Sequence, residues 1–319
     1  MTVTTGAYRA AVDELTPQQA KVVAALRQGD RRQFSPSLAR DLRSHLEDEL
    51  APYARMLADR DDQIVLSKRS IEQLHTCEAF HVADENTPFQ WSVPVAKGTI
   101  AHRAVELAGF LPSMPSPAEL AENTIGRLAA DASGSGTIAD FLITLTDTER
   151  AELTSEVTAL VSAHFDGFPP LPKSWKPVYE GRVRAELCVG RITLAGKVDL
   201  TIGTPQGNTA GRVLVDLKTG RPSATHLHDL RFYALLETLR SGVPPFRLAS
   251  YYLDSGALHP EDVDESVLEV AVRRVIDAVD TKLALMQSVR EPATTPGPQC
   301  RWCPIAHRCP DALDERDTD

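Results

Sequence analysis

Residues 214–220, LVDLKTG, place one carboxylate and one ammonium group inside an otherwise apolar run. In a β-strand, residues i and i+2 project from the same face, so Asp216 and Lys218 would lie together while Val215 and Leu217 pack the other way. Two explanations fit this pattern. The pair is either a half-buried ion pair that stabilises the strand or part of a chemical site.

Two similar runs precede this stretch, VYEGRVRAELCVG at 178–190 and RITLAGKVDLTIG at 191–203, and together the three predict consecutive strands. If the last two pair as a hairpin across the loop at 203–211, Asp199 lies beside Asp216. Two carboxylates about 4–6 Å apart suit Mg²⁺ or Mn²⁺. Lys218 could then orient or help to deprotonate an attacking water and offset charge on a phosphoryl group.

The rest of the chain alternates helical and strand-like patterns. We expect helices within 8–60, at 66–80, at 98–110 with an abrupt start at Gly98, at 224–242 and at 261–290, a helical insertion at 111–172, and a strand at 246–256. This pattern predicts an α/β fold divided into a helical N-terminal region (1–65), a core with the insertion (66–256), and a C-terminal helix with a cysteine segment (257–319).

Composition and charge restrict the class of protein. The 319-residue chain has ordinary hydrophobic and charged fractions, and no apolar run approaches the ~18–20 residues that span a bilayer, so we expect a cytoplasmic protein without a membrane partner. The formal net charge of −10 argues against a globally basic nucleic-acid coat. Residues 173–221 nevertheless hold nine basic and four acidic side chains, 9 − 4 = +5, which predicts a local basic region.

A histidine and several cysteines add candidate ligands. His102 and Glu106 are four residues apart and share a helix face, so His102 could give an imidazole to the same metal, with Glu106 as a weaker outer candidate. Cys300, Cys303 and Cys309 follow C-x2-C-x5-C spacing and nearly complete a four-thiolate site.

The fourth ligand of this site is either another cysteine, Cys77 or Cys188, or a histidine. Cys188 is most simply a core residue, which leaves Cys77, although joining it to Cys300 closes a loop of 300 − 77 = 223 residues. That closure costs about 5 kcal/mol, less than the roughly 10–16 kcal/mol that structural metal sites release. The alternative is a zinc knuckle that uses His307, and spacing alone does not separate iron from zinc.

Together these residues resemble the PD-(D/E)XK nucleases of the RecB/AddB type, particularly the iron–sulfur members that include small CRISPR-associated exonucleases. The order of motifs carries the resemblance over residues 66–310. It consists of Cys77, His102 in GTIAHRAVE, Asp199 in GKVDL, Asp216 and Lys218 in VDLKTG, Tyr233 in DLRFYALL, and then Cys300, Cys303 and Cys309.

The resemblance implies a restriction-endonuclease-like three-layer α/β core with a central mixed sheet. It implies that His102, Asp199, Asp216 and the Leu217 carbonyl hold Mg²⁺ or Mn²⁺, and that Lys218 positions water for attack on a DNA phosphodiester. It also implies that Cys77 and the C-terminal triplet hold a [4Fe–4S] cluster that staples the ends of the domain.

One position departs from the family pattern. Where the family has Gln four residues before the Tyr, this chain has Asp229, which would repel a phosphate unless His228 or Arg231 compensates. Tyr233 itself is either an active-site residue or a core aromatic on the apolar face with Leu230 and Leu236.

The leading hypothesis is a metal-dependent DNA exonuclease that acts on single strands or DNA ends, in repair, recombination or anti-phage defence. A second hypothesis is a nuclease-like subunit that binds DNA or a partner without cleaving. A third is a zinc-stapled protein of unrelated function. A helicase or integrase-type protein is the expected protein partner.

Overall fold

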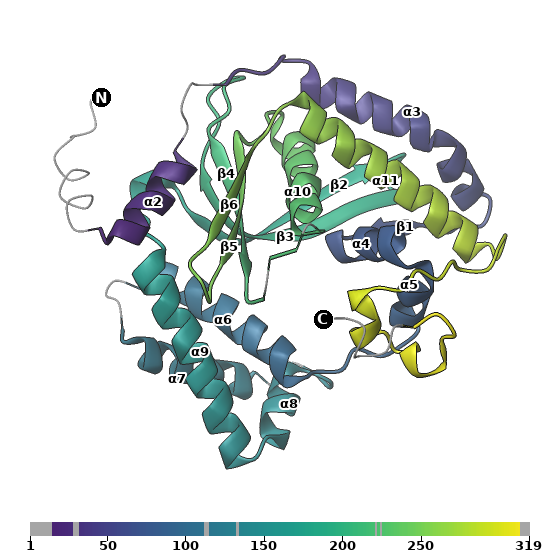
Figure 1. The fold of residues 1–319 in the computed structure, drawn as a ribbon. Coiled ribbons are helices and arrows are strands. Elements are labelled where there is room, and N and C mark those ends of the chain that lie inside the picture. The colour runs from purple at the N-terminus through teal and green to yellow at the C-terminus, as the bar shows by residue number, and fades with distance from the viewer. Residues whose placement is uncertain are drawn as a thin grey trace.

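One mixed β-sheet of six strands forms the centre of the described part of the chain (Figure 1). The computed structural model describes residues 15–27, 32–111, 115–131, 134–220, 222–223 and 225–312. The strands are β1 (Ile64–Leu66), β2 (Val178–Leu187), β3 (Ile192–Gly203), β4 (Arg212–Lys218), β5 (Arg247–Tyr252) and β6 (Leu258–Asp262). The order is β1-β3-β4-β5-β6, and β2 also pairs with β3.

The pairing makes the sheet mixed, as the family resemblance implied. β1 runs parallel to β3, and β4 runs parallel to β5, while β2–β3, β3–β4 and β5–β6 are antiparallel. The β3–β4 hairpin has Leu200 opposite Val215 and closes across the loop that follows Gly203. The three strands expected at 178–218 are therefore confirmed, together with the hairpin.

Helices cover both faces of the sheet and build a separate bundle beside it (Figure 1). The α-helices are α2 (Pro17–Leu26), α3 (Leu38–Ala58), α4 (Lys68–Thr76), α5 (Glu78–Glu85), α6 (Val93–Phe110), α7 (Pro117–Ala130), α8 (Ile138–Thr144), α9 (Asp147–Gly167), α10 (Thr225–Ser241) and α11 (Glu265–Met286). Short 3₁₀ helices lie at Lys173–Trp175, Pro298–Trp302 and Ala306–Arg308.

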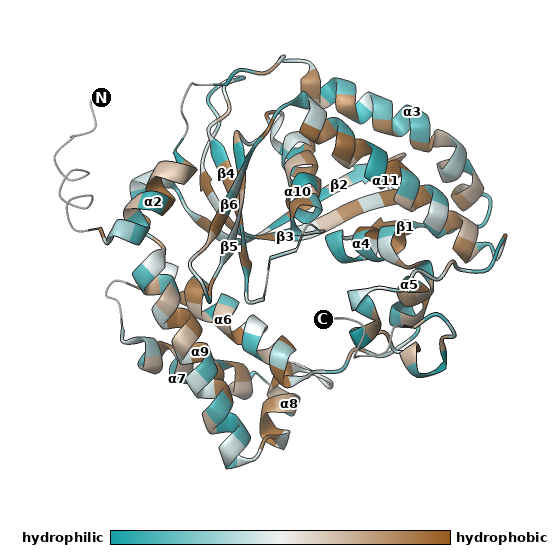
Figure 2. Cartoon of the chain, viewed as in Figure 1, coloured by the Kyte–Doolittle hydropathy of each residue, from teal (hydrophilic) through white to brown (hydrophobic). Residues whose placement is uncertain are grey.

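Alternation along the strands separates two hydrophobic cores. On β4, Leu214 packs with α3, α4, α10 and α11, whereas Val213, Val215 and Leu217 pack with α2, α6 and α9 on the opposite face. A third core lies between α6, α7, α8 and α9. Figure 2 shows the matching bands of hydrophobic and hydrophilic residues along α3 and α11. The α/β class with helices on both sheet faces is confirmed.

Several predicted boundaries were wrong. The helix expected at 66–80 is divided at Cys77, whose extended backbone (φ −157°) separates α4 from α5. The helix that carries His102 begins at Val93 instead of Gly98, and Gly98 lies inside it against the side chain of Thr219. The helix expected at 261–290 begins at Glu265 because the short strand β6 precedes it.

Short elements explain the remaining differences. β1 has three residues and β6 has five, so neither is long enough to show a clear alternation of polar and apolar residues. The expected helical region at 8–60 contains α2 and α3, and its residues 8–14 and 28–31 lie outside the described residues. Within the described residues, no helix combines the length and apolarity needed to cross a membrane.

Candidate functional site

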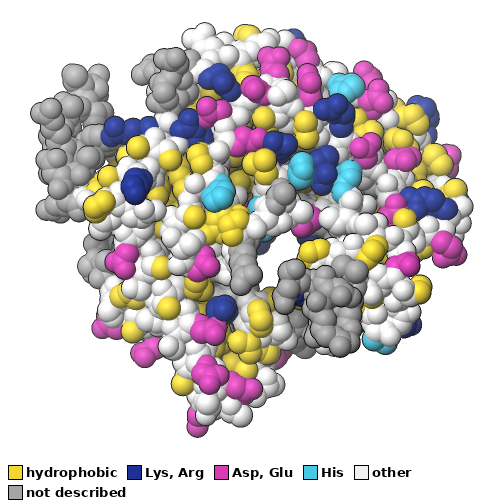
Figure 3. All heavy atoms as spheres, viewed as in Figure 1, with side chains coloured by type: hydrophobic (Ala, Val, Ile, Leu, Met, Phe, Trp, Pro, Cys, Tyr) yellow, Lys and Arg dark blue, Asp and Glu magenta, His cyan; other side chains and the backbone are white. Residues whose placement is uncertain are grey.

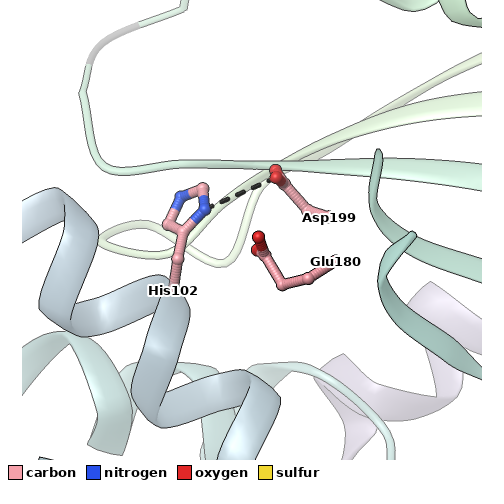
Figure 4. A group of neighbouring side chains, drawn as sticks. All are labelled: His102, Glu180 and Asp199. Carbon is pink, nitrogen blue, oxygen red and sulfur yellow. Dashed lines mark ion pairs between the residues drawn. The ribbon is translucent and has the colours of Figure 1, made fainter. Parts of the chain in front are cut away.

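Three side chains from separate elements converge beside the β3–β4 hairpin (Figure 4). His102 projects from α6, Glu180 from β2 and Asp199 from β3, and one ligand atom of each lies within 4.8 Å of the others. The Nδ1 atom of His102 is 3.6 Å from the Oδ1 atom of Asp199. One imidazole nitrogen and two carboxylate groups form a donor set suited to a divalent cation such as Mn²⁺.

The hairpin fixes the carboxylate of Asp199. The backbone N–H of Leu217 on β4 donates a 2.7 Å hydrogen bond to Oδ2 of Asp199. This bond leaves Oδ1 toward His102 and holds Asp199 next to the Asp216–Leu217 peptide. The hairpin therefore brings the Asp199 carboxylate to the strand that carries Asp216, and the convergence of the two carboxylates on one ion stays a prediction.

Glu180 is the ligand candidate that the sequence analysis missed. It lies on β2 between Tyr179, which pairs with Leu200, and Gly181, which pairs with Val198, so it stands opposite Asp199 in the antiparallel register. Its φ of 54° is in the left-handed region, which is uncommon for a non-glycine residue and clusters at functional sites. Its carboxylate also pairs with Lys197. The β2–β3 register is the signal that could have identified it.

Asp216 lies in a second cluster, together with two lysines. Its Oδ2 atom is 2.7 Å from Nζ of Lys218, and its Oδ1 atom is 3.0 Å from Nζ of Lys68 at the start of α4. The residue is 1% exposed. Burial by itself would raise the pKa of Asp216, but the two ammonium groups outweigh burial and lower that pKa. Asp216 and Lys218 share one face of β4, as the strand pattern predicted.

The two clusters act on each other electrostatically. Burial would lower the pKa of His102, but the carboxylate of Asp199, followed by those of Asp216 and Glu180, raises it above its ordinary value. Lys68 is likewise influenced by both aspartates: burial would lower its pKa, and Asp216 first and Asp199 more weakly act to raise it. The site is thus one connected region of charge at the β3–β4 hairpin.

Asp229 on α10 is compensated by lysines. Its Oδ2 atom is 3.1 Å from Nζ of Lys218 and 3.9 Å from Nζ of Lys68. Arg231 instead binds Glu261 on β6, with Nε 3.1 Å from both carboxylate oxygens. The expected compensation by His228 or Arg231 is replaced by these two lysine contacts.

Tyr233 is both a core residue and a neighbour of the site. Its ring packs against Gly196 of β3, where an added Cβ would lie 2.5 Å from Cε1 of the ring. Nζ of Lys68 lies 5.4 Å from the ring centroid. Burial is the main reason that the pKa of Tyr233 is raised to about 12. The core packing expected of Tyr233 is therefore present, and its role in the active site stays a prediction.

Glu106 forms an ion pair with Arg103 on the same helix. Its carboxylate is therefore engaged one turn along α6 from His102. Its role as an outer ligand stays a prediction.

Four cysteines line one pocket near the C-terminus. Cys77 at the α4–α5 junction lines this pocket together with Cys300, Cys303 and Cys309. Burial raises the pKa of Cys303, and Cys77, Cys300 and Cys309 add to the increase. Cys188 lies elsewhere, with Sγ 3.8 Å from the carbonyl oxygen of Glu47.

The spacing of these sulfurs is wider than one small ion requires. A tetrahedral zinc site with Zn–S distances of about 2.3 Å brings its sulfurs within roughly 4 Å of one another. Among the described residues, no three cysteine sulfurs lie within 4.8 Å of each other. His307, the alternative zinc ligand, is exposed.

The basic region at 173–221 is partly neutralised. Five of its nine basic residues form ion pairs with acidic partners, and a sixth, Arg221, lies outside the described residues. The five are Arg184, Arg191, Lys197, Arg212 and Lys218. In Figure 3 dark blue and magenta side chains are interspersed over the face shown. The local excess of positive charge is therefore smaller than the sequence count suggested.

Comparison with known proteins gives the family. A "Putative exonuclease" from Eubacterium rectale is similar in structure, with a TM-score of 0.45 and 11% identity over 79% of this chain and 90% of that chain. The protein SSO0001 has a TM-score of 0.34 and 14% identity over 85% of this chain and 98% of that chain. No curated protein matches the sequence. The PD-(D/E)XK nuclease superfamily matches residues 65–310, and the chain belongs to that superfamily.

Proposed function

We propose that this chain is a divalent-metal-dependent deoxyribonuclease that hydrolyses phosphodiester bonds at DNA ends or in single strands. The observation that carries the proposal is the convergence of His102, Glu180 and Asp199 within 4.8 Å, beside Asp216 and Lys218 on the paired strand. Family membership gives the nuclease class. The preference for DNA ends or single strands comes from the resemblance alone.

The residues present fit a divalent ion. His102, Glu180 and Asp199 would hold it, and Asp216 with the Leu217 carbonyl are further expected ligands. A bound Mg²⁺ or Mn²⁺ would lower the pKa of a water molecule and stabilise charge on the phosphate. The imidazole favours Mn²⁺ over Mg²⁺ as the better activator, because Mg²⁺ prefers oxygen ligands.

Side chains of the protein complete the chemistry. Lys218, 2.7 Å from Asp216, would orient the attacking water and donate a hydrogen bond to the phosphate oxygen on which charge develops. Leu217 donates its N–H to Asp199 and keeps that carboxylate oriented. Tyr233, against Gly196, supports the strand from α10.

The cysteine pocket offers four thiols to one bound group. Among the described residues, no three of these sulfurs lie mutually within 4.8 Å, as the sulfurs of a closed single-ion zinc site would. We propose that Cys77, Cys300, Cys303 and Cys309 hold a [4Fe–4S] cluster that connects the α4–α5 junction to the C-terminal segment. Absorbance near ~400 nm in the purified protein would support iron, and its absence together with bound zinc would favour the zinc alternative.

A second candidate function has a specific observation in its favour. Both oxygens of Asp216 are engaged by lysine ammonium groups, so this carboxylate must exchange a partner before it binds an ion. A DNA-binding or partner subunit without turnover would tolerate that arrangement. A helicase or integrase-type partner and a cytoplasmic location stay predictions for either function.

The test is cleavage of linear and circular single-stranded DNA with Mn²⁺, Mg²⁺ or EDTA. We expect Mn²⁺-dependent degradation of the linear substrate, and at least about 10³-fold less with Asp216→Asn, because a metal-supporting carboxylate is lost. Asp254→Asn, at an exposed turn, is the matched control. Full activity in Asp216→Asn would reject the assigned site. DNA binding by the wild-type protein without cleavage under any ion would favour the silent subunit.

A further inference from the structure

Lys68 is a second lysine at the site, and it comes from a different layer of the fold than Lys218. It occupies the first residue of α4, directly after the capping Ser67 at the end of β1. Its Nζ atom is 3.0 Å from Oδ1 of Asp216 and 3.9 Å from Oδ2 of Asp229. It therefore joins a carboxylate on the central strand to a carboxylate on α10.

Lys68 decides the sign of the net charge at the site once a divalent ion is bound. Glu180 is paired with Lys197, and Glu72 and Arg274 beside Asp229 carry opposite charges that cancel. This leaves the three carboxylates of Asp199, Asp216 and Asp229 and the ammonium groups of Lys68 and Lys218. Their formal sum is −3 + 2 = −1. With one divalent ion the sum becomes +1, which matches a single phosphodiester charge. Without Lys68 the ion-loaded site would be neutral.

We propose that Lys68 is a positioning residue that offsets Asp229 and holds Asp216, so that the metal-loaded site keeps a net positive charge for the scissile phosphate. The inference rests on the proposed function, because it concerns the same metal and phosphate. Lys68 acts through the two aspartates without contacting the reacting atoms.

The inference also accounts for the unusual residue on α10. A carboxylate at 229 sits 3.1 Å from Lys218, so it would draw that lysine away from the phosphate if no other cation were near. Lys68 contributes the second positive charge, and Asp229 then serves as an anchor between two lysines. A neutral residue at 229 should remove the need for Lys68.

The test is a four-variant cycle of wild type, Lys68→Met, Asp229→Asn and the double variant. Mn²⁺ binding is measured by titration calorimetry and cleavage of single-stranded DNA by steady-state kinetics, both on the full chain with its native cysteine-bound group. Arg69→Met is the matched control, because it removes one positive charge from the same turn of α4 and its partner is Asp84, outside the site.

The two readouts should move in opposite directions. Lys68→Met should bind Mn²⁺ about tenfold more tightly, because a repelling charge is gone and Asp216 is released, and it should raise KM for DNA about tenfold. The double variant should return both values toward wild type. Arg69→Met should change neither.

Other outcomes overturn the inference. A purely structural lysine would weaken Mn²⁺ binding and cleavage together, and Asp229→Asn would not restore them. Unchanged Mn²⁺ affinity in Lys68→Met would also reject the role. If the wild-type protein binds Mn²⁺ without cleaving DNA, the proposed nuclease function fails, while the Mn²⁺ measurements across the cycle still decide the role of Lys68.

Discussion

The candidate metal site and the cysteine pocket differ in what holds their side chains in place. His102, Glu180 and Asp199 project from α6, β2 and β3, and the Leu217 N–H fixes one of the carboxylates at 2.7 Å. The cysteines instead come from the break between α4 and α5 and from short 3₁₀ turns near the C-terminus. Regular structure orients the first set, and irregular backbone carries the second.

This difference indicates that the first set of side chains is arranged before anything binds, whereas the cysteines would be arranged by the group that binds. Donors on paired strands are close together before an ion arrives, so the ion adds chemistry to an existing site. Sulfurs on irregular segments about 223 residues apart in the chain would gain their geometry from a bound group, and that binding free energy would become folding free energy. Removing a ligand should therefore damage chemistry in one region and stability in the other.

The largest expected effect is in the cysteine pocket. Cys303→Ser should remove absorbance near ~400 nm and release the C-terminal segment, with a loss of about 10 kcal/mol of group-linked stabilisation. Thermal unfolding and limited proteolysis after α11 would measure the change. Cys188→Ser, away from the pocket, is the control and should retain the absorbance. A Cys303→Ser protein with wild-type absorbance and melting temperature would contradict the assignment.

The next largest effect is expected in the candidate metal site, where a substitution should lower activity and leave stability unchanged. Asp199→Asn should lower Mn²⁺-dependent cleavage at least about 10³-fold, equivalent to about 4 kcal/mol, while the melting temperature stays within a few degrees of wild type. The amide oxygen can still accept the Leu217 hydrogen bond, which is why folding should be preserved. Absorbance near ~400 nm should be unchanged. If Asp199→Asn unfolded the protein or removed the absorbance expected from the proposed cluster, the two regions would not be independent.

The sequence predicted the parts of the site that follow from local periodicity. Asp216 and Lys218 share a face because strand residues alternate, and Asp199 approaches them because the two strands form a hairpin. Glu180 depends on the register between β2 and β3, and Lys68 depends on how β1 and α4 pack against the sheet. Neither relation is encoded in local residue spacing, so both residues required the structure.

A smaller effect on stability should follow from adding a side-chain atom at Gly196, where β3 packs against Tyr233. Gly196→Ala would place a Cβ 2.5 Å from the buried Tyr233 ring and should cost about 1–3 kcal/mol of unfolding free energy by overpacking. Cleavage should fall as well, because Tyr233 supports the strand beside Asp199. Gly126→Ala on α7 is the control: nothing lies within 4 Å of its added Cβ, and alanine favours helix. If Gly196→Ala and Gly126→Ala were equally stable in chemical denaturation, the contact between β3 and Tyr233 would be loose enough to accept the extra methyl group.

The smallest expected effect concerns His164 on α9, behind the helix that carries His102. Its ring stacks on Phe168 with centroids 5.1 Å apart, and its Nδ1 is buried without a hydrogen-bond partner in the described structure. Burial, with a smaller contribution from His102, lowers the pKa of His164 to about 3.

Since the unfolded chain takes up this proton below about pH 6.5 and the folded chain does not, the stability conferred by neutral His164 is complete above pH 6.5 and declines as the pH falls toward 3. Between pH 6.5 and 5 the unfolding free energy should drop by about 1.5 kcal/mol from this group. His164→Phe should flatten that part of the profile in urea denaturation, while His45→Phe at an exposed position of α3 should leave it unchanged. An unaltered slope in His164→Phe would mean that this histidine accepts its proton without loss of the fold, and that the layer behind His102 is less rigid than the strands it covers.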